Sequence, residues 1–126
     1  MAEPKRNIIS LNTYNELYVI DCDVVMYLQA DDHYTIVNYL SGAHFMVPFG
    51  LSVLEDSIQE CCSNDKFLVR LGRKYIINIR AIFHINTVKQ VVLLSDAHGN
   101  NHSLHLPKPI LRSLIDLLSN GVISRK

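Results

Sequence analysis

The stretch FLVRLGRKYIINIRAI, residues 67–82, holds four basic side chains and no acidic one. Its two halves, FLVRL and KYIINI, are rich in the branched and aromatic residues typical of strands. Between them stands Gly72, which tolerates the backbone of a tight turn. The pattern predicts a hairpin with Arg73 and Lys74 projecting from its connection.

Alternation along the first strand of this hairpin places Phe67, Val69 and Leu71 on one face, and Leu68 with Arg70 on the other. No Asp or Glu occurs from residue 66 to residue 95, so no acid close in sequence balances the cations. A guanidinium at the turn matches guanine bidentately or grips a phosphate, whereas a lysine acts there as a point charge. The alternative is an ordinary charged hairpin on a solvated surface.

The formal net charge of zero hides a division of the chain. Residues 1–65 carry two basic and ten acidic side chains, a balance of −8, and residues 66–126 carry ten basic and two acidic ones, a balance of +8. A basic surface favours a polyanion, because each Lys or Arg that meets a phosphate releases condensed counterions. Two alternatives stay open: the acidic half folds back onto the basic half, or the halves of two copies pair in a protein-interaction or dimerisation module.

Short strand-like segments fill the first half of the chain and return after residue 66. Turn-forming groups such as ADDH and SGA separate them, and the loop DAHGNNHS (96–103) leads into a last strand, LHL. The strands expected before that loop cover residues 8–12, 16–21, 24–30, 34–40, 44–49, 67–71, 74–79, 81–87 and 90–95.

Two segments change to a helical period. In LSVLEDSIQECC (51–62), Ser52 with Glu55 resembles a capping box, and the apolar face consists of Leu51, Leu54, Ile58 and a cysteine. The second segment, PKPILRSLIDLLSNG (107–121), begins with prolines and ends at Asn120 and Gly121. Its apolar stripe consists of Ile110, Leu111, Leu114, Ile115 and Leu118.

Length and composition indicate one mostly β domain with two short helices, long enough at 126 residues to bury a core without disulfides or a metal. The apolar runs are far shorter than the roughly 20 residues of a membrane span, and the charged start MAEPKRN lacks the apolar core of a signal peptide. We therefore expect a cytoplasmic protein, with tails at 1–7 and 121–126 around a domain at 8–120. Three cysteines, two of them adjacent, indicate reduced thiols rather than a disulfide framework.

Signatures of catalysis and of cofactor binding are absent from the sequence: it has no serine elbow, P-loop or glycine-rich dinucleotide fingerprint. The carboxylates at 21–23 and 31–32 are interpreted as solvated turn charges. His98, His102 and His105 near one hairpin are the best metal candidate, but we expect no carboxylate or cysteine close by to complete a zinc site. His102 and His105 also point to opposite faces of an extended strand. We expect no enzyme, metal or cofactor, and a metal-dependent hydrolase is the alternative.

The hairpin at 67–82 resembles the signature of the LytTR DNA-binding domain, the output module of many bacterial response regulators, which runs Phe-x-x-Arg-Val-His-Arg-Ser-Tyr-x-Val-Asn. The likeness extends over nearly the whole chain, since VVMYLQADDHYTIVNYLSG resembles a strand pair of the family, LSVLEDSI its helix, and LHLPKPILRSL its closing strand and helix. It implies an elongated, mostly β fold that reads DNA by side chains on loops, with no helix laid in the major groove. The residues that match the signature are Phe67, Arg70, Leu71, Arg73, Tyr75, Ile76, Ile77 and Asn78.

By position, the resemblance assigns the DNA contacts to three loops: the turn before the fourth strand, the centre of the signature and the start of the last helix. Arg70 either contacts DNA or supports the hairpin, and Asn78 is expected to fix the backbone. The contacting residues implied in the three loops are His33, Tyr34, Arg73, Lys74 and Lys108.

The chain departs from the family pattern at three places. Gly72 stands where the family usually has His, Lys74 where it has Ser, and Pro107 with Lys108 where Ser-Arg is common. The changes remove two polar donors and add a charge. Affinity for the DNA backbone is therefore expected to be retained, whereas base choice does not follow from the family pattern.

The leading prediction is a sequence-specific, non-enzymatic transcriptional regulator of the two-component type. Its partner would be double-stranded DNA with promoter repeats, bound by single copies or by a homodimer. We expect no receiver domain in the short N-terminal tail. We therefore expect either the output domain of a longer response regulator or a stand-alone version.

Overall fold

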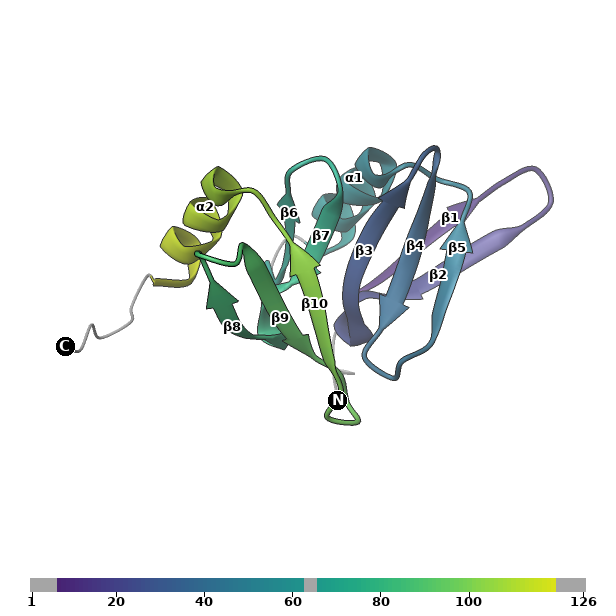
Figure 1. Cartoon of the computed structure of the whole chain (residues 1–126). Helices are drawn as coiled ribbons and strands as arrows, with labels where there is room; N and C mark the ends of the chain where they lie inside the picture. Colours follow the sequence, from purple (N-terminus) through teal and green to yellow (C-terminus); the bar gives the residue numbers. More distant parts are fainter. Residues whose placement is uncertain (1–6, 63–65, 120–126) are drawn as a thin grey trace, which may run out of the picture.

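Figure 1 shows a computed structural model of the chain, which describes residues 7–62 and 66–119. All strand pairs are antiparallel and form a central sheet of order β5-β4-β3-β7-β6, a sheet of order β10-β9-β8 and the ribbon β1-β2. The elements are β1 (Ile8–Asn12), β2 (Leu17–Asp21), η1 (Cys22–Val24), β3 (Val25–Asp31), β4 (Tyr34–Tyr39), β5 (His44–Val47), α1 (Leu51–Cys61), β6 (Leu68–Leu71), β7 (Tyr75–Asn78), η2 (Ile79–Ala81), β8 (Ile82–Asn86), β9 (Val91–Ser95), β10 (Asn101–His105) and α2 (Lys108–Ser119).

Strand β7 lies between the two cores of the molecule. All of its residues are buried, because β3 and β6 flank it and both faces of the central sheet are covered. Ile76 packs into a hydrophobic cluster with α1 and the β1-β2 ribbon. Tyr75 and Ile77 pack into a second cluster with α2 and the β8–β10 sheet. An unbroken apolar run is what a strand buried on both faces requires.

Helix α1 buries Leu51, Leu54 and Ile58, the face predicted from the sequence. The predicted capping box is wrong. The helix begins directly after Gly50, which makes no side-chain cap, so Ser52 already lies inside the first turn. Glu55 instead accepts a hydrogen bond from a distant arginine, described below.

Helix α2 begins at Lys108 and buries Leu111 and Leu114 in the second cluster. Its predicted end at Asn120 and Gly121 lies outside the described residues. No helix in the described ranges combines the length and the apolar character needed to cross a membrane.

One strand ends and another begins at a residue other than the one predicted from the sequence. Strand β5 ends at Val47, since Pro48 has no N–H to continue the ladder. Strand β10 begins at Asn101, which pairs with Ser95, so the connecting loop is shorter than predicted.

Phe67 was predicted to share a face with Leu71, and this is wrong. Phe67 precedes β6 and packs in the first cluster, whereas Leu71 packs in the second. The Arg80 guanidinium lies 4.4 Å from the centroid of the Phe67 ring, where a cation–π contact stabilises the arrangement.

All three cysteines lie in the described residues, and no disulfide joins them there. Cys22 and Cys62 are buried, and Cys61 is exposed. Burial, together with neighbouring Cys62, raises the pKa of the Cys22 thiol well above its ordinary value. This thiol therefore stays neutral and packs as a small hydrophobe.

Candidate nucleic-acid interface

The turn between β6 and β7, residues 72–74, stands at the end of a rigid hairpin and is called the tip below. The strands stay paired up to Leu71 and Tyr75, and the tip residues are exposed. Gly72 has φ +69°, the conformation that the sequence predicted for it. The side chains of Arg73 and Lys74 are therefore presented to solvent from a base that is buried on both faces.

The tip contacts elements on both sides. The Lys74 carbonyl accepts a hydrogen bond of 2.8 Å from the Ala30 N–H near the end of β3. Gly72 lies against the first turn of α2, where a Cβ at position 72 would be 2.7 Å from Ile110 Cδ1. The positive φ explains why the chain has glycine at this position, since the atom that a Cβ would meet is the end of a side chain that can move aside.

Helix α2 also lies beside the turn between β8 and β9. Lys108 and Arg112, one helical turn apart, line a small cavity together with Thr87 and Val88. Lys89 in the same turn is exposed, and its N–H donates to Asn86 Oδ1 at 3.0 Å.

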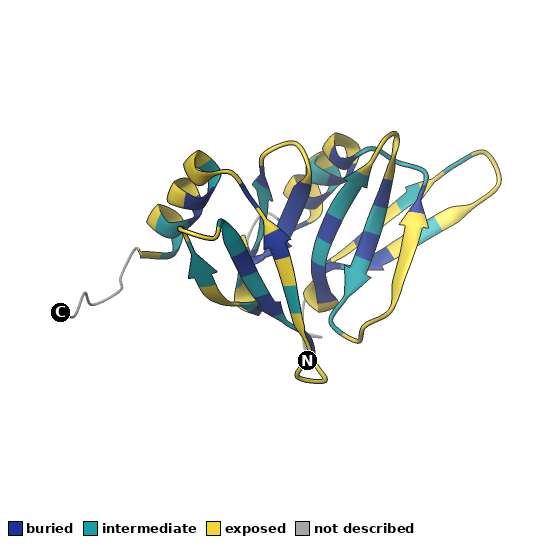
Figure 2. Ribbon diagram, viewed as in Figure 1, coloured by how far each residue is buried: buried dark blue, intermediate teal, exposed yellow. Residues whose placement is uncertain are grey.

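These contacts link four segments: the β3–β4 turn, the β6–β7 turn and the start of α2 at the top of Figure 1, and the β8–β9 turn just below α2, all with exposed residues in Figure 2. We call the four segments together the upper edge and define it as residues 31–34, 72–74, 87–90 and 108–112. Its exposed basic side chains are Arg73, Lys74, Lys89, Lys108 and Arg112.

The β3–β4 turn contributes polar and aromatic groups to the upper edge but no net positive charge. The His33 imidazole lies 3.7 Å from the Asp32 carboxylate, with both side chains mostly exposed. Tyr34 is 47% exposed at the start of β4. With Asp31 and Asp32 beside them, His33 and Tyr34 can supply hydrogen bonds and stacking, while electrostatic attraction to an anion comes from the other segments.

Of the three histidines considered for a metal site, His98 and His102 lie around the β9–β10 loop, at the opposite end of the molecule (Figure 1), whereas His105 ends β10 and pairs with Val91 beside the upper edge. A carboxylate does stand close to the first two, contrary to the prediction: His102 Nε2 lies 3.0 Å from Asp96 Oδ2. Asp96 Oδ1 also accepts the N–H groups of His98 and Asn100, at 2.8 and 2.9 Å. Within the described ranges, no three His, Cys, Asp or Glu side chains lie close enough to hold a metal ion.

We expect Asp96 to make folding sensitive to acid. Its hydrogen bond with His102, supported by the Asn100 and His98 N–H groups, holds the pKa of this carboxyl well below its ordinary value. The stabilisation is present above the unfolded-state pKa of about 4 and is lost as the pH falls toward the folded-state value. Urea unfolding at pH 5 and pH 3 should show a smaller acid loss for Asp96→Asn than for the native chain, and parallel losses would contradict this role.

The family follows from comparison with known proteins. A family model described as the LytTr DNA-binding domain matches residues 15–118. The chain belongs to the LytTR family. The fold is also similar to the LytTr DNA-binding domain of a Bacillus cereus protein described as a methyl-accepting/DNA response regulator. The two structures align with a TM-score of 0.60 and 22% sequence identity, and the alignment covers 89% of this chain and 96% of that one. Comparison with curated proteins gives no match.

The family and the mostly β fold predicted from the sequence are thus confirmed, and a LytTR domain is a DNA-binding rather than a catalytic module. Five of the six predicted contact residues lie on the upper edge of this LytTR domain, and their contact with DNA stays a prediction. The five are His33, Tyr34, Arg73, Lys74 and Lys108.

Arg70, the sixth, bonds within the protein. Its Nε donates to the Gly72 carbonyl at 2.8 Å, and its Nη1 donates to Glu55 Oε1 at 3.1 Å. The acid that was missing near this cation in sequence therefore comes from α1, in the acidic half of the chain. At this point the two halves meet within one molecule, and Arg70 is bonded to the tip through the Gly72 carbonyl.

Lys89 and Arg112 of the upper edge were not predicted as contact residues from the sequence. Arg112 stands four residues after Lys108, a spacing that places both on one helix face, and this signal was present in the sequence. Lys89 gave no such signal, because its place on the upper edge depends on how the β8–β9 turn packs beside α2.

Proposed function

We propose that this LytTR domain is a sequence-specific transcriptional regulator that reads duplex DNA with the side chains of the upper edge. The observation that carries the proposal is the convergence on that edge of five exposed basic side chains from three separate segments. Lys and Arg on such a surface replace the counterions of DNA phosphates, which drives binding and makes it depend on salt.

The roles of the segments differ in this proposal. Arg73 enters a groove and bonds guanine bidentately, because its fork of donors matches the O6 and N7 acceptors. Lys74, Lys108 and Arg112 hold phosphates and set the register. His33 and Tyr34 contact bases or sugars in a neighbouring groove, where hydrogen bonding and stacking need no net charge.

We further propose that two copies bind paired promoter repeats as a homodimer on DNA, in the bacterial cytoplasm, as the output domain of a response regulator. The similar Bacillus cereus domain is described as part of a response regulator, which supports this setting. Two-fold pairing of protomers matches repeats with fixed spacing, so the spacing of selected sites reports on it.

Selection of bound sequences from random DNA, followed by a salt titration of the best site, tests the proposal. With Lys74, Lys108 and Arg112 on phosphates, the slope of log K against log salt for one copy is expected to be on the order of −3. Lys108→Ala should reduce the slope by about 1. Lys66→Ala, which removes an exposed lysine outside the upper edge, should leave it unchanged. A flat salt response with no preferred sequence would refute the proposal.

The variant Glu55→Gln tests whether Arg70 supports the tip or contacts DNA, because it removes the acidic partner of Arg70. If Arg70 supports the tip, loss of its acidic partner lowers stability by up to about 1 kcal/mol and leaves DNA affinity equal or weaker. If Arg70 instead binds phosphate, removing the competing carboxylate must strengthen binding. We expect the first result, measured by fluorescence anisotropy with labelled DNA, and tighter binding by this variant would show that Arg70 contacts DNA.

A further inference from the structure

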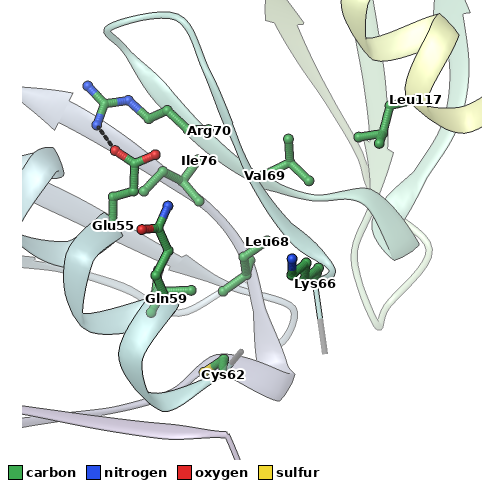
Figure 3. A pocket seen from close by; sticks show the side chains of 10 residues that line it. Glu55, Gln59, Cys62, Lys66, Leu68, Val69, Arg70, Ile76 and Leu117 are labelled. Atoms are coloured by element: carbon green, nitrogen blue, oxygen red, sulfur yellow. Dashed lines mark hydrogen bonds and ion pairs between the residues drawn. The ribbon is translucent and has the colours of Figure 1, made fainter. Parts of the chain in front are cut away.

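A cavity of about 620 Å³ lies along β6, between α1 and the last turn of α2. Its volume is within the range of roughly 300–1,000 Å³ that is typical of small-molecule sites. Figure 3 shows side chains from both helices and from the central sheet around it. The apolar walls are formed by Ile58, Leu68, Val69, Ile76 and Leu117.

The position of β6 explains why a cavity forms here. β6 is an outer strand of the central sheet, and within the described residues only β7 pairs with it. Leu68 and Arg70 point toward α1, whereas Val69 points toward Leu117 of α2 (Figure 3). The two helices therefore wall the outer edge of the sheet, where backbone polar groups lie beside apolar walls.

The charged side chains of the cavity are unevenly distributed. Arg70 and Glu55 bond to each other at one end, while Lys66 lies at the other end (Figure 3). Among the described residues of the lining there are two cations and one carboxylate, Glu55, which bonds Arg70, so no described carboxylate lies at the Lys66 end. This end attracts an anion, and the walls between the two ends accept an apolar body.

We propose that this cavity binds an amphipathic organic anion, whose carboxylate meets Lys66 and whose aliphatic or aromatic body lies against Leu68, Val69 and Leu117. The ligand reaches Arg70 at the far end, and Arg70 also holds the Gly72 carbonyl. Ligand binding in the cavity should therefore alter the hydrogen bond by which Arg70 holds the tip. This last consequence rests on the proposed function, whereas binding itself does not.

Titration of the ¹⁵N-labelled full chain with octanoate, followed by amide shifts, tests the proposal. We expect saturable shifts confined to residues 55–62, 66–72, 76 and 117, and about tenfold weaker binding of octan-1-ol, which lacks the charge. Lys66→Ala should bring the affinity for octanoate down to that for octan-1-ol. Shifts that do not saturate, or that centre on the exposed apolar residues of the β1-β2 ribbon, would overturn the proposal.

A matched pair of variants separates the cavity from general surface binding. Leu117 and Val53 are both aliphatic, lie on helices and are 43% and 46% exposed, but only Leu117 lines the cavity. Leu117→Asp should weaken octanoate binding at least about tenfold, because a carboxylate then stands in the apolar wall. Val53→Asp should leave the affinity within about twofold. Equal effects of the two variants would overturn the proposal.

Two further outcomes have distinct meanings. If the same amides broaden with protein concentration in the absence of octanoate, a second copy covers the cavity and the proposal is wrong. When DNA binding is measured at saturating octanoate, the affinity of the native chain for DNA should change. The affinity of Leu117→Asp for DNA should stay the same. Octanoate binding by a chain that binds no DNA would refute the proposed function while supporting the ligand site.

Discussion

Replacement of Asn78 by Asp is expected to lower the free energy of unfolding by about 3–5 kcal/mol at pH 7. Asn78 is 2% exposed. Its Nδ2 donates to the Val25 carbonyl at 2.8 Å, and its Oδ1 accepts the Arg80 N–H at 2.9 Å. Aspartate is nearly the same size but loses the donor, so a buried carboxylate oxygen would face the Val25 carbonyl without a proton between them.

Urea unfolding followed by circular dichroism measures this loss, and Asn86→Asp is the matched control. Asn86 Oδ1 also accepts a backbone N–H, from Lys89 at 3.0 Å, but Asn86 is only partly buried and its side chain stays near water. The control should lose less than about 1 kcal/mol. The deficit of Asn78→Asp should also shrink in acid, as the introduced carboxyl protonates and regains a donor. Losses of equal size at the two sites would contradict the buried role of Asn78.

Local patterns in the sequence were sufficient for most of the secondary structure. The predicted bounds of β1 agree with the structure, and the apolar period of residues 51–62 gave the buried face of α1. These features depend on neighbours two to four residues apart, which the sequence displays directly.

Pairings between distant residues could not be predicted in this way. Glu55 was interpreted as part of a capping box, but it bonds Arg70, fifteen positions away. Asp96 was not recognised as the partner of His102, because the pairing depends on where the β9–β10 loop turns. In both cases a side chain had a plausible local role, and the tertiary fold supplied a better partner.

The candidate site likewise combines features that the local sequence predicts with features that depend on tertiary packing. The hairpin signature identified Arg73 and Lys74, since their turn is encoded by adjacent residues. The departure at Gly72 follows from the positive φ of its turn, whereas its position beside Ile110 is a contact between segments far apart in the chain. Local sequence therefore specifies each loop of this domain, while packing of α2 against the tip decides which loops share an edge.

Arg73→Ala is expected to cost about 1–3 kcal/mol of binding free energy at particular base pairs, a loss of roughly five- to 150-fold for the best sites. Lys74→Ala, one residue away in the same exposed turn, should weaken binding to all sequences alike and reduce the salt slope by about 1. The difference follows from chemistry, because a guanidinium fork selects guanine acceptors and an ammonium meets any phosphate.

Affinities for the selected site and for each of its single-base variants, measured at several salt concentrations, distinguish the two roles. Arg73→Lys is the matched control, because it keeps the charge and loses the bidentate geometry. This variant should retain the salt slope of the native chain while its preference at the guanine position disappears. If Arg73→Ala and Lys74→Ala instead weaken every sequence equally, both side chains bind only the DNA backbone. Base readout would then belong to His33 and Tyr34 on the β3–β4 turn, the part of the upper edge where contacts do not depend on positive charge.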